Sequence, residues 1–216
     1  MSEVGGARDT IGRTPQLEEE PMPMKSRFAA TGAITALALG GCSMMGPPST
    51  GDHVFSLTSS SFKDGTMLEK KNAGKNPKNP NCIGENVSPP LTFSNPPAGT
   101  KSYALLMLDP EGRQGLGVSH WVAYGIPVSV TGFAEGETSR LTDKYVGGKG
   151  TQGLGYYLGP CTPPATGMHH YTFTLIATDL DPKELPPGLT RDEVLAKLQG
   201  HTKGAAGLVG LFGRAP

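Results

Sequence analysis

The sequence predicts a mostly β domain with one or two short helices in its C-terminal third. The 31 glycines and 20 prolines are about 24% of the 216 residues, which is about twice their ordinary share, and both residue types weaken helix interiors. The clearest periodic segments are short runs of β-branched and aromatic residues flanked by Gly or Pro. These two observations exclude a helical bundle, and the length fits one domain with a substantial core.

Five segments have the composition and the short length of strands. In chain order they are residues 54–57, 91–93, 102–108, 120–126 and 170–178. The last segment alternates cleanly, because Tyr171 and Phe173 share one face while Thr172 and Thr174 share the other. This alternation is typical of a strand with one buried face.

The helix signal is confined to the C-terminal third of the chain. Thr190 and Glu193 have the spacing of a capping box, in which each side chain bonds the backbone N–H of the other residue. The apolar run 194–198 follows, and Gly200 is a typical helix terminator. We therefore expect a short helix that begins after Thr190 and ends before Gly200.

The N-terminal segment differs in character from the rest of the chain. Residues 1–23 are polar, end in an acidic run and show no periodicity, which indicates disorder or a start codon placed too far upstream. From residue 24 onward, a short basic region precedes an apolar segment and a small-residue sequence that ends at Cys42. This order is typical of a bacterial lipoprotein signal, in which the cysteine is lipidated and becomes the new N-terminus. A signal peptide of another kind and a short buried helix are the alternatives.

Four parts are therefore expected along the chain. They are residues 1–23, which precede the signal, the lipoprotein signal 24–41, a tether 42–52, and one domain 53–216. A chain processed in this way is held by its lipid at the bacterial cell envelope, where we expect it to face the periplasm. No stretch of 18 or more unbroken apolar residues is present, so an ordinary transmembrane helix is not expected.

The charge of the chain is balanced, with 19 Lys and Arg against 19 Asp and Glu. A nucleic-acid partner normally requires a basic excess, which this composition lacks. We therefore expect no nucleic acid among its partners.

The cysteine count predicts one disulfide. Cys82 and Cys161 are the cysteines that remain once Cys42 carries lipid, and two thiols in an oxidising compartment are expected to pair. The bond would close a loop of about 80 residues and add several kcal/mol of stability on a loop-entropy argument. Two buried free thiols are the alternative, and zinc is disfavoured because no CxxC spacing is present.

Three familiar kinds of motif can be set aside. The run Gly148-Lys-Gly150-Thr-Gln-Gly153 fits G-x-G-x-x-G, but no hydrophobic strand precedes it and no helix can open after it, so we expect a loop. No G-x-S-x-G surrounds any serine, and no H-E-x-x-H is present. His169 and His170 are adjacent, so on a strand they point to opposite faces and cannot easily share one metal ion.

Four polar residues lie at the ends of the predicted strands. Asp109 closes one run, His120 opens the next, and His169 and Tyr171 lie in phase at the start of the third. Strand ends of a β-sandwich gather at its rim, so these four side chains could converge on one pocket. Each also has a structural alternative: a carboxylate that satisfies turn amides, a histidine at the edge of the core, or a tyrosine with a solvated hydroxyl.

Several short motifs occur in a fixed order along the chain. They are Asn86-Val-Ser-Pro-Pro-Leu91, Asp109-Pro-Glu111, Ser119-His-Trp-Val122, Gly159-Pro160-Cys161, His169-His-Tyr171 and the closing Leu208-Val-Gly-Leu-Phe-Gly-Arg214. In order and spacing they resemble the phosphatidylethanolamine-binding protein family, in its bacterial Raf-kinase-inhibitor-like branch. The resemblance covers about residues 53–214.

The resemblance implies a β-sandwich of two antiparallel sheets with a few short peripheral helices. It also implies a small pocket for anions, such as the phosphate of a phospholipid head group. The family's pocket positions match Asp109, His120, Pro160, His169 and Tyr171 in this sequence.

The chain departs from the family pattern at three places near this pocket. Glu111 replaces a second aspartate, Leu158 stands where the pocket loop has glycine, and Thr162 interrupts a Cys-Pro-Pro sequence. We expect Leu158 to narrow the entrance of the pocket, so the ligand is less closely defined than the fold.

We expect a binding protein rather than an enzyme. Histidine and tyrosine side chains can donate hydrogen bonds to phosphate, and a nearby carboxylate favours the charged form of histidine and fixes its tautomer. No nucleophile and no metal set lie within the same motifs, so neither a cofactor nor a metal is expected. Two alternatives remain: an inhibitor that acts on an envelope protease or another protein, and a hydrolase in which Asp109 holds His120 or His169 as a general base.

Overall fold

The computed structural model describes residues 54–214. The expected lipoprotein signal, the lipidation site at Cys42 and the tether lie outside the described residues. Within this range, no helix has the length and apolar character needed to span a bilayer.

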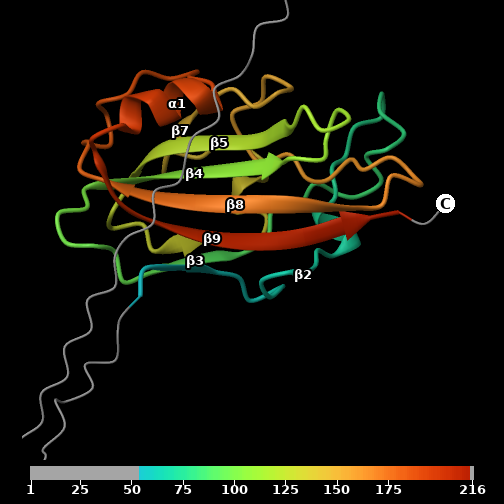
Figure 1. Cartoon of the computed structure of the whole chain (residues 1–216), viewed down its shortest axis with the longest axis horizontal. Helices are drawn as coiled ribbons and strands as arrows, with labels where there is room; N and C mark the ends of the chain where they lie inside the picture. Colours follow the sequence, from blue (N-terminus) through green and yellow to red (C-terminus); the bar gives the residue numbers. More distant parts are fainter. Residues whose placement is uncertain (1–53, 215–216) are drawn as a thin grey trace, which may run out of the picture. The chain divides into compact units, whose positions relative to one another are not determined.

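The domain consists of two β-sheets (Figure 1). The smaller sheet has the strand order β1–β3–β6, formed by Ser56–Thr58, Leu91–Ser94 and Gly132–Phe133. The larger sheet has the order β2–β9–β8–β4–β5–β7, formed by Thr66–Met67, Thr202–Gly213, Met168–Thr178, Ser102–Asp109, Val118–Pro127 and Val146–Gly147. One α-helix, α1 (Arg191–Leu198), and two short 3-10 helices, Lys70–Asn72 and Glu137–Ser139, complete the described elements.

The predicted mostly β fold is confirmed, with one difference in strand direction. Each of the five predicted strands overlaps an observed strand, and all the paired strands are antiparallel except β2 and β9. The β2–β9 pair is parallel and involves only Thr66 and Met67 on the β2 side. The two expected antiparallel sheets are therefore present, and β2 is a short parallel exception at one edge.

Strand β9 is the long element that residue patterns did not predict. Half of its twelve residues are Gly or Ala, which have low β propensity. It forms because it pairs with β8 along nearly its whole length, from Met168 opposite Gly213 to Thr178 opposite Thr202. Its strand conformation is therefore imposed by a neighbour rather than by its own side chains.

The larger sheet is buried on both faces. On one face Tyr171, Phe173 and Leu175 of β8 belong to the core shared with the smaller sheet. On the other face Leu106 and Ile176 belong to a second apolar cluster, which includes Val194 and Leu198 of α1 and Val122 of β5. This double coverage explains why β4 reads as a continuous apolar run rather than an alternating one.

The helix α1 has the ends that its sequence predicts. The Glu193 N–H donates to Thr190 Oγ1 at 3.3 Å, and the Glu193 carboxylate accepts the Thr190 N–H at 2.8 Å. The capping box is thus formed, and the helix ends at Leu198 before Gly200, whose φ is +82°. A glycine tolerates this left-handed conformation without a steric penalty.

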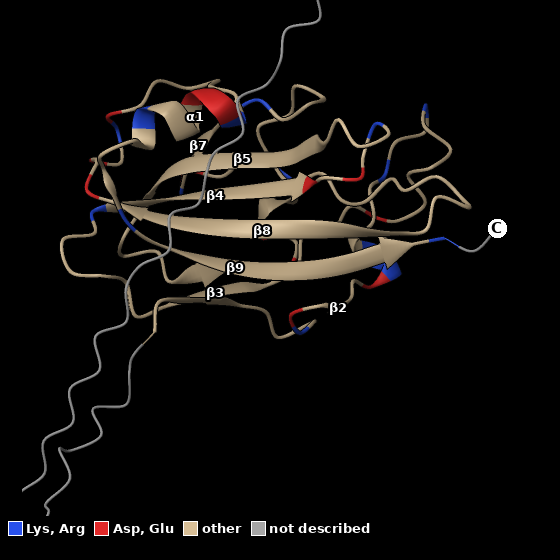
Figure 2. Cartoon of the chain, viewed as in Figure 1, with Lys and Arg blue, Asp and Glu red and all other residues tan. Residues whose placement is uncertain are grey.

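The two edges of the larger sheet carry strands of only two residues, β2 and β7. Beside β2, the Gly65 N–H donates to the Val209 carbonyl, and the Asp64 carboxylate accepts the Val209 N–H, both at 2.8 Å. Beside β7, the Gly148 N–H donates to the Val122 carbonyl at 2.8 Å. Charged side chains lie mainly in the loops and at strand ends, and the strand interiors are almost free of them (Figure 2).

Candidate functional site

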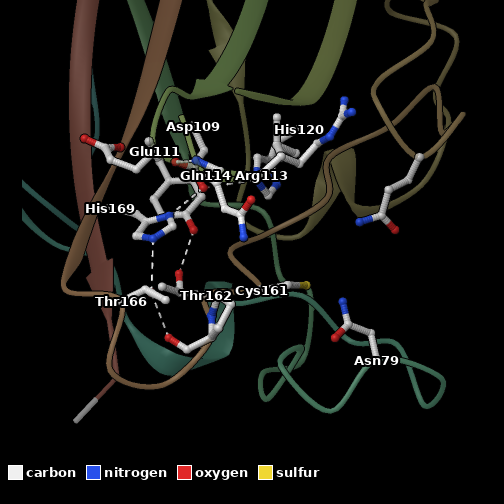
Figure 3. Close-up of a pocket in the computed structure, with 15 residues that line it drawn as sticks. Asn79, Asp109, Glu111, Arg113, Gln114, His120, Cys161, Thr162, Thr166 and His169 are labelled. Atoms are coloured by element: carbon white, nitrogen blue, oxygen red, sulfur yellow. Dashed lines mark hydrogen bonds and ion pairs between the residues drawn. The ribbon is translucent and has the colours of Figure 1, made fainter. Parts of the chain in front are cut away.

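Three strands of the larger sheet bring the predicted polar residues to one place. Strand β4 runs antiparallel to both β5 and β8, so its last residue lies beside the first residues of the other two. Asp109 ends β4, His120 is near the start of β5, and His169 and Tyr171 are near the start of β8. The four side chains line one cavity of about 600 Å³, and Figure 3 shows Asp109, His120 and His169 among its lining residues.

These four side chains belong to the interior and not to an open rim. Their exposed fractions are 3% for Asp109, 4% for His120, 5% for His169 and 0% for Tyr171. The rest of the cavity wall comes from loop 111–114, from residues 161–163, from Val118 of β5 and from single residues of other loops. Buried polar groups need hydrogen-bond partners, so each of the four has a structural role as well as access to the cavity.

The Asp109 carboxylate contacts several polar groups of the site. Its Oδ2 accepts a hydrogen bond from His169 Nδ1 at 2.8 Å, and its Oδ1 accepts the Gly112 N–H at 2.9 Å. His120 Nε2 lies 3.9 Å from the same Oδ2. The carboxylate therefore lies between two imidazoles and fixes the proton of His169 on Nδ1.

His120 is held from the other side of its ring. Its Nδ1 donates to the Leu158 carbonyl at 2.9 Å, which leaves Nε2 for the cavity. Burial lowers the pKa of His120, and the Leu158 carbonyl and the Asp109 carboxylate oppose this effect only in part. The ring is consequently neutral at neutral pH, with an unprotonated Nε2 that can take up a proton when an anion arrives.

The Asn86 side chain supports the loop that holds His120. Its amide donates to the Tyr157 carbonyl at 3.0 Å, and its Oδ1 accepts the Gly159 N–H at 2.9 Å. Asn86 therefore clamps the two residues on either side of Leu158. Asn86, which begins the motif Asn86-Val-Ser-Pro-Pro-Leu91, thus helps to position His120 of the motif Ser119-His-Trp-Val122.

Tyr171 adds a neutral hydroxyl to the cavity. Its oxygen lies 2.7 Å from Thr162 Oγ1, and its ring packs edge-on to His120 with centroids 5.1 Å apart. Burial raises the pKa of Tyr171 far above its ordinary value, so the hydroxyl stays protonated. Thr162, which departs from the family sequence, is thus the partner of a pocket residue.

Glu111 and His170 form a pair of their own. The Glu111 carboxylate accepts the His170 backbone N–H at 3.0 Å and its Nδ1–H at 2.7 Å. Partial burial by itself would raise the pKa of Glu111, but these two hydrogen bonds give a net lowering. His170 is exposed and does not line the cavity, as its position on the opposite face from His169 predicts.

Asp109, Glu111 and His169 also offer ligand atoms that lie within 4.8 Å of one another. This spacing would admit a divalent cation. However, His169 Nδ1 already donates to Asp109, and both Glu111 oxygens accept from His170. A cation would therefore compete with these hydrogen bonds for the same atoms.

Two expectations about the pocket wall are wrong. Pro160 is buried but does not line the cavity, and its carbonyl accepts the Gly74 N–H at 2.8 Å. The wall is formed by the next residues, 161–163. Leu158 does not narrow the entrance, because its side chain is buried away from the cavity and only its carbonyl reaches His120.

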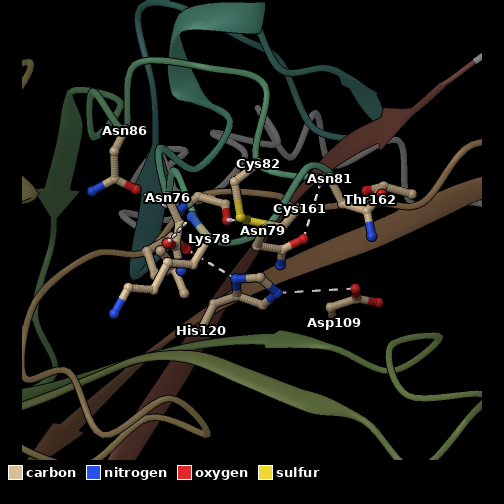
Figure 4. Close-up of a disulfide and its surroundings, with 12 residues drawn as sticks. Asn76, Lys78, Asn79, Asn81, Cys82, Asn86, Asp109, His120, Cys161 and Thr162 are labelled. Carbon is tan, nitrogen blue, oxygen red and sulfur yellow. Dashed lines mark hydrogen bonds and ion pairs between the residues drawn. A yellow bond between two sulfur atoms is a disulfide. The ribbon is translucent and has the colours of Figure 1, made fainter.

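The predicted disulfide joins Cys82 to Cys161 (Figure 4). The Cα atoms are 4.3 Å apart across a sequence separation of 79 residues. Cys161 and Asn79 both line the cavity, so the bond fastens the loop around Asn79 to the cavity wall. Gly74 leaves room for it, since an added Cβ there would lie 2.5 Å from Cys161 Sγ.

Residue patterns missed the contribution of the loop between β4 and β5. Arg113 and Gln114 line the cavity and have φ angles of 53° and 61°, which are uncommon for residues with a side chain. No periodic signal marks loop residues. The available signal is the position of a glycine-rich segment directly after Asp109.

Comparison with known proteins agrees with this geometry. The sequence pattern of the phosphatidylethanolamine-binding protein family matches residues 58–213. A UPF0098 protein of Methanothermobacter thermautotrophicus is 39% identical over 143 residues, which cover 65% of this chain and 92% of that protein. A Mycobacterium tuberculosis protein named as a candidate lipoprotein, LppC, is 32% identical over 216 residues, with 90% and 98% covered.

The fold is similar to a solved member of the same family. The crystal structure of YbcL from E. coli, described as a new member of the mammalian PEBP family, superposes with a TM-score of 0.66 and 29% identity. The match covers 74% of this chain and 98% of YbcL. Sequence pattern, relatives and fold agree, and the chain belongs to the phosphatidylethanolamine-binding protein family.

Proposed function

We propose that the cavity binds small anions that carry a phosphate group, of the kind found in phospholipid head groups. The observation that carries this proposal is the set of three buried side chains with hydrogen-bonding groups, His120, His169 and Tyr171, around one cavity with Asp109 between the histidines. Membership of a family named for binding phosphatidylethanolamine supports the same ligand class. Donors fixed in advance lose little conformational entropy when a phosphate binds.

The charges that line the cavity link anion binding to proton uptake. Asp109 and Glu111 bring two negative charges, and Arg113 brings one positive charge. If His120 and His169 are neutral, the cavity lining has a net charge of minus one, which disfavours an anion. Each protonated imidazole adds one positive charge and one hydrogen-bond donor. Each carboxylate already has a hydrogen-bond partner, since Asp109 accepts from His169 Nδ1 and Glu111 accepts from His170.

We infer that binding occurs without chemical conversion of the ligand. Within residues 54–214, no serine lines the cavity, and the cysteine that does is Cys161, whose sulfur is bonded to Cys82. The Thr162 hydroxyl is engaged with Tyr171. The Thr166 hydroxyl lies 3.2 Å from His169 Nε2, but it donates its proton to the Pro163 carbonyl at 2.9 Å, so neither threonine hydroxyl is free for activation by a base.

Titration calorimetry with phosphoethanolamine tests the function, with ethanolamine as the control that lacks the phosphate. We expect saturable 1:1 binding of phosphoethanolamine and none of ethanolamine. Phosphorus NMR of the same mixture should show an unchanged ligand after prolonged incubation. Equal responses to both compounds would overturn the proposed ligand class, and released phosphate would overturn binding without turnover.

We further propose that the chain is a lipoprotein of the cell envelope, anchored through Cys42 and facing the periplasm. The sequence before Cys42 supports the anchor, and similarity to the mycobacterial protein named as a candidate lipoprotein is consistent with it. Labelling with a fatty acid in a bacterial host should mark the natural chain but not Cys42→Ala. An unlabelled product that retains residues before Cys42 would contradict the anchor.

A further inference from the structure

A second concave surface lies on the other side of the loop that follows Asp109. This groove, of about 560 Å³, is lined by residues of that loop, by the glycine-rich segment 149–153, by Ser119 of β5 and by the start of α1. Arg113 lines both this groove and the cavity that contains His120 and His169, which we call the histidine cavity. One loop therefore separates the groove from the histidine cavity. The segment 148–153 fits G-x-G-x-x-G in sequence but has no role in the histidine cavity apart from Gln152.

Three cations from three separate segments converge on the groove. They are Arg113, Lys149 and Arg191. Arg191 pairs with Asp192 at 3.0 Å, and Asp192 is the only carboxylate in the groove lining. Neither Arg113 nor Lys149 forms an ion pair with any residue between 54 and 214.

The groove therefore carries an excess of two positive charges in a chain whose formal net charge is zero. The nearby Glu193 carboxylate interacts with Lys149 through space, but it does not line the groove. Its oxygen accepts from Thr190 in the capping box. Glu193 offsets part of this positive potential, and one positive charge remains in excess when it is counted, so an anion is the ligand that the groove favours.

Backbone hydrogen bonds hold the groove walls in place. The Lys149 N–H donates to the Leu189 carbonyl, and the Thr151 N–H donates to the Ser119 carbonyl, both at 2.8 Å. The Ser119 N–H donates in turn to Thr151 Oγ1 at 2.9 Å. The glycine-rich segment is therefore fixed to β5 on one side and to the entry of α1 on the other.

The groove lining also contains a buried hydroxyl that is not satisfied. Ser119 Oγ is buried and has no hydrogen-bond partner among the described residues. A buried hydroxyl without a partner costs free energy, because it has lost its bonds to water. A rotation of the Ser119 side chain toward the groove would let a ligand oxygen supply the missing acceptor.

We propose that this groove is a second anion-binding site, which takes a phosphate-bearing group independently of the histidine cavity. Arginine binds phosphate with two parallel N–H donors, and lysine binds it as a compact charge. The phosphate comes either from a second group of the ligand that fills the histidine cavity or from a separate anion. Both sources use the same groove chemistry, and the experiment below distinguishes them.

NMR titration of the 15N-labelled domain with inorganic phosphate tests the proposal. We expect the amides of Gly117, Thr151 and Gly153 to shift in a saturable manner. The double variant Lys149→Gln, Arg191→Gln should raise the fitted Kd by at least about tenfold, the effect of losing one charge-assisted hydrogen bond. The single variant Lys149→Arg keeps the positive charge and should retain phosphate binding. It still tests the role of this charge if the double variant does not fold.

A matched control removes two exposed lysines outside the groove, in the variant Lys63→Gln, Lys183→Gln. It makes the same change of net charge and should leave the Kd unchanged. No shift at the groove amides, or equal loss of binding in the control, would overturn the site. His120→Asn should abolish shifts around the cavity only, so failure of the groove and failure of the proposed cavity function are separable.

Pyrophosphate then identifies the source of the second phosphate. If one ligand bridges both sites, binding has 1:1 stoichiometry, and the groove and cavity variants lose affinity in a non-additive way. If the sites are separate, two molecules bind and each variant affects one of them. Either result requires the groove site, whereas binding that is insensitive to the groove cations overturns it.

Discussion

His169 Nδ1 lies 2.8 Å from Asp109 Oδ2, although the two residues are 60 positions apart in the sequence. The contact exists because the last residue of β4 and the first residues of β8 meet at the same edge of the larger sheet. The hydrogen bond fixes the His169 proton on Nδ1 and directs Nε2 toward Thr166 Oγ1, at 3.2 Å. The site's hydrogen-bond pattern is thus set by strand pairing before any ligand binds.

The two ring nitrogens of His120 should contribute differently to binding. An asparagine amide can replace Nδ1 as the donor to Leu158, whereas a glutamine amide reaches the position of Nε2. We expect His120→Asn to weaken phosphoethanolamine binding by about 1.5 to 3 kcal/mol, the size of a charge-assisted hydrogen bond, and His120→Gln to weaken it less. Calorimetry measures both, with thermal unfolding as a check because the ring is buried.

His170→Ala is the matched control for His169→Ala. His169→Ala should lose affinity to a similar extent as His120→Asn, because it removes a polar side chain of the cavity and leaves Asp109 Oδ2 without its hydrogen-bond partner. His170 is exposed and contacts only Glu111 among the described acidic residues, so its removal should change affinity little. Equal affinities for both variants and the natural protein would show that the cavity assignment is wrong.

Phosphate affinity should rise as the pH falls. Burial lowers the pKa of His120, so this ring is neutral in the ligand-free protein at neutral pH. A bound phosphate stabilises the protonated ring, and the ligand therefore binds together with a proton. Calorimetry in buffers with different ionisation enthalpies should reveal proton uptake, which His120→Asn reduces; an affinity independent of pH would contradict this coupling.

The stability of the ligand-free protein should change in the opposite direction. Because the folded-state pKa of His120 lies below its ordinary value of 6.5, the unfolded chain binds more protons between these two pKa values. Stability is then full above about pH 6.5 and falls as the pH drops toward the folded-state pKa. Urea unfolding in phosphate-free buffer between about pH 7 and 5, above the carboxylate range, measures this loss, and His120→Asn should flatten the profile.

Removal of the disulfide should affect stability and binding together. Cys82→Ser with Cys161→Ser should lower the free energy of unfolding by about 4.5 kcal/mol on the loop-entropy argument. The same change frees the Asn79 loop from the cavity wall, so phosphoethanolamine affinity should fall as well. Non-reducing peptide mapping establishes the bond in the natural protein, and unchanged affinity after its removal would show that the wall is held by other contacts.

Much of the fold could be predicted because its central strands carry strong local signals. Alternation in β8 and the capping box of α1 are properties of neighbouring residues, and both are present in the structure. Strand β9 could not be predicted from residue patterns, since its Gly and Ala residues take their conformation from β8. The parallel pairing of β2 with β9 joins residues that are more than 130 positions apart in the sequence, and no local sequence pattern indicates such a pairing.

The convergence of the site was predictable for a related reason. Asp109, His120 and His169 lie at strand ends, and antiparallel neighbours bring such ends together. Pro160 is predicted to line the cavity but does not, because its position beside Cys161 in the sequence does not determine which side of the loop faces the cavity. Arg113 was missed because its left-handed conformation belongs to a loop whose path is set by tertiary contacts.

The short strands β2 and β7 have a consequence for how copies of this chain behave side by side. A long open sheet edge recruits strands from neighbouring molecules, and such pairing leads to aggregation. Here each edge strand offers only two residues, and Val209 beyond β2 already has both backbone groups bonded. With a formal net charge of zero, repulsion between copies is weak, so we expect the shortness of these two edge strands to limit strand pairing between molecules at β2 and β7.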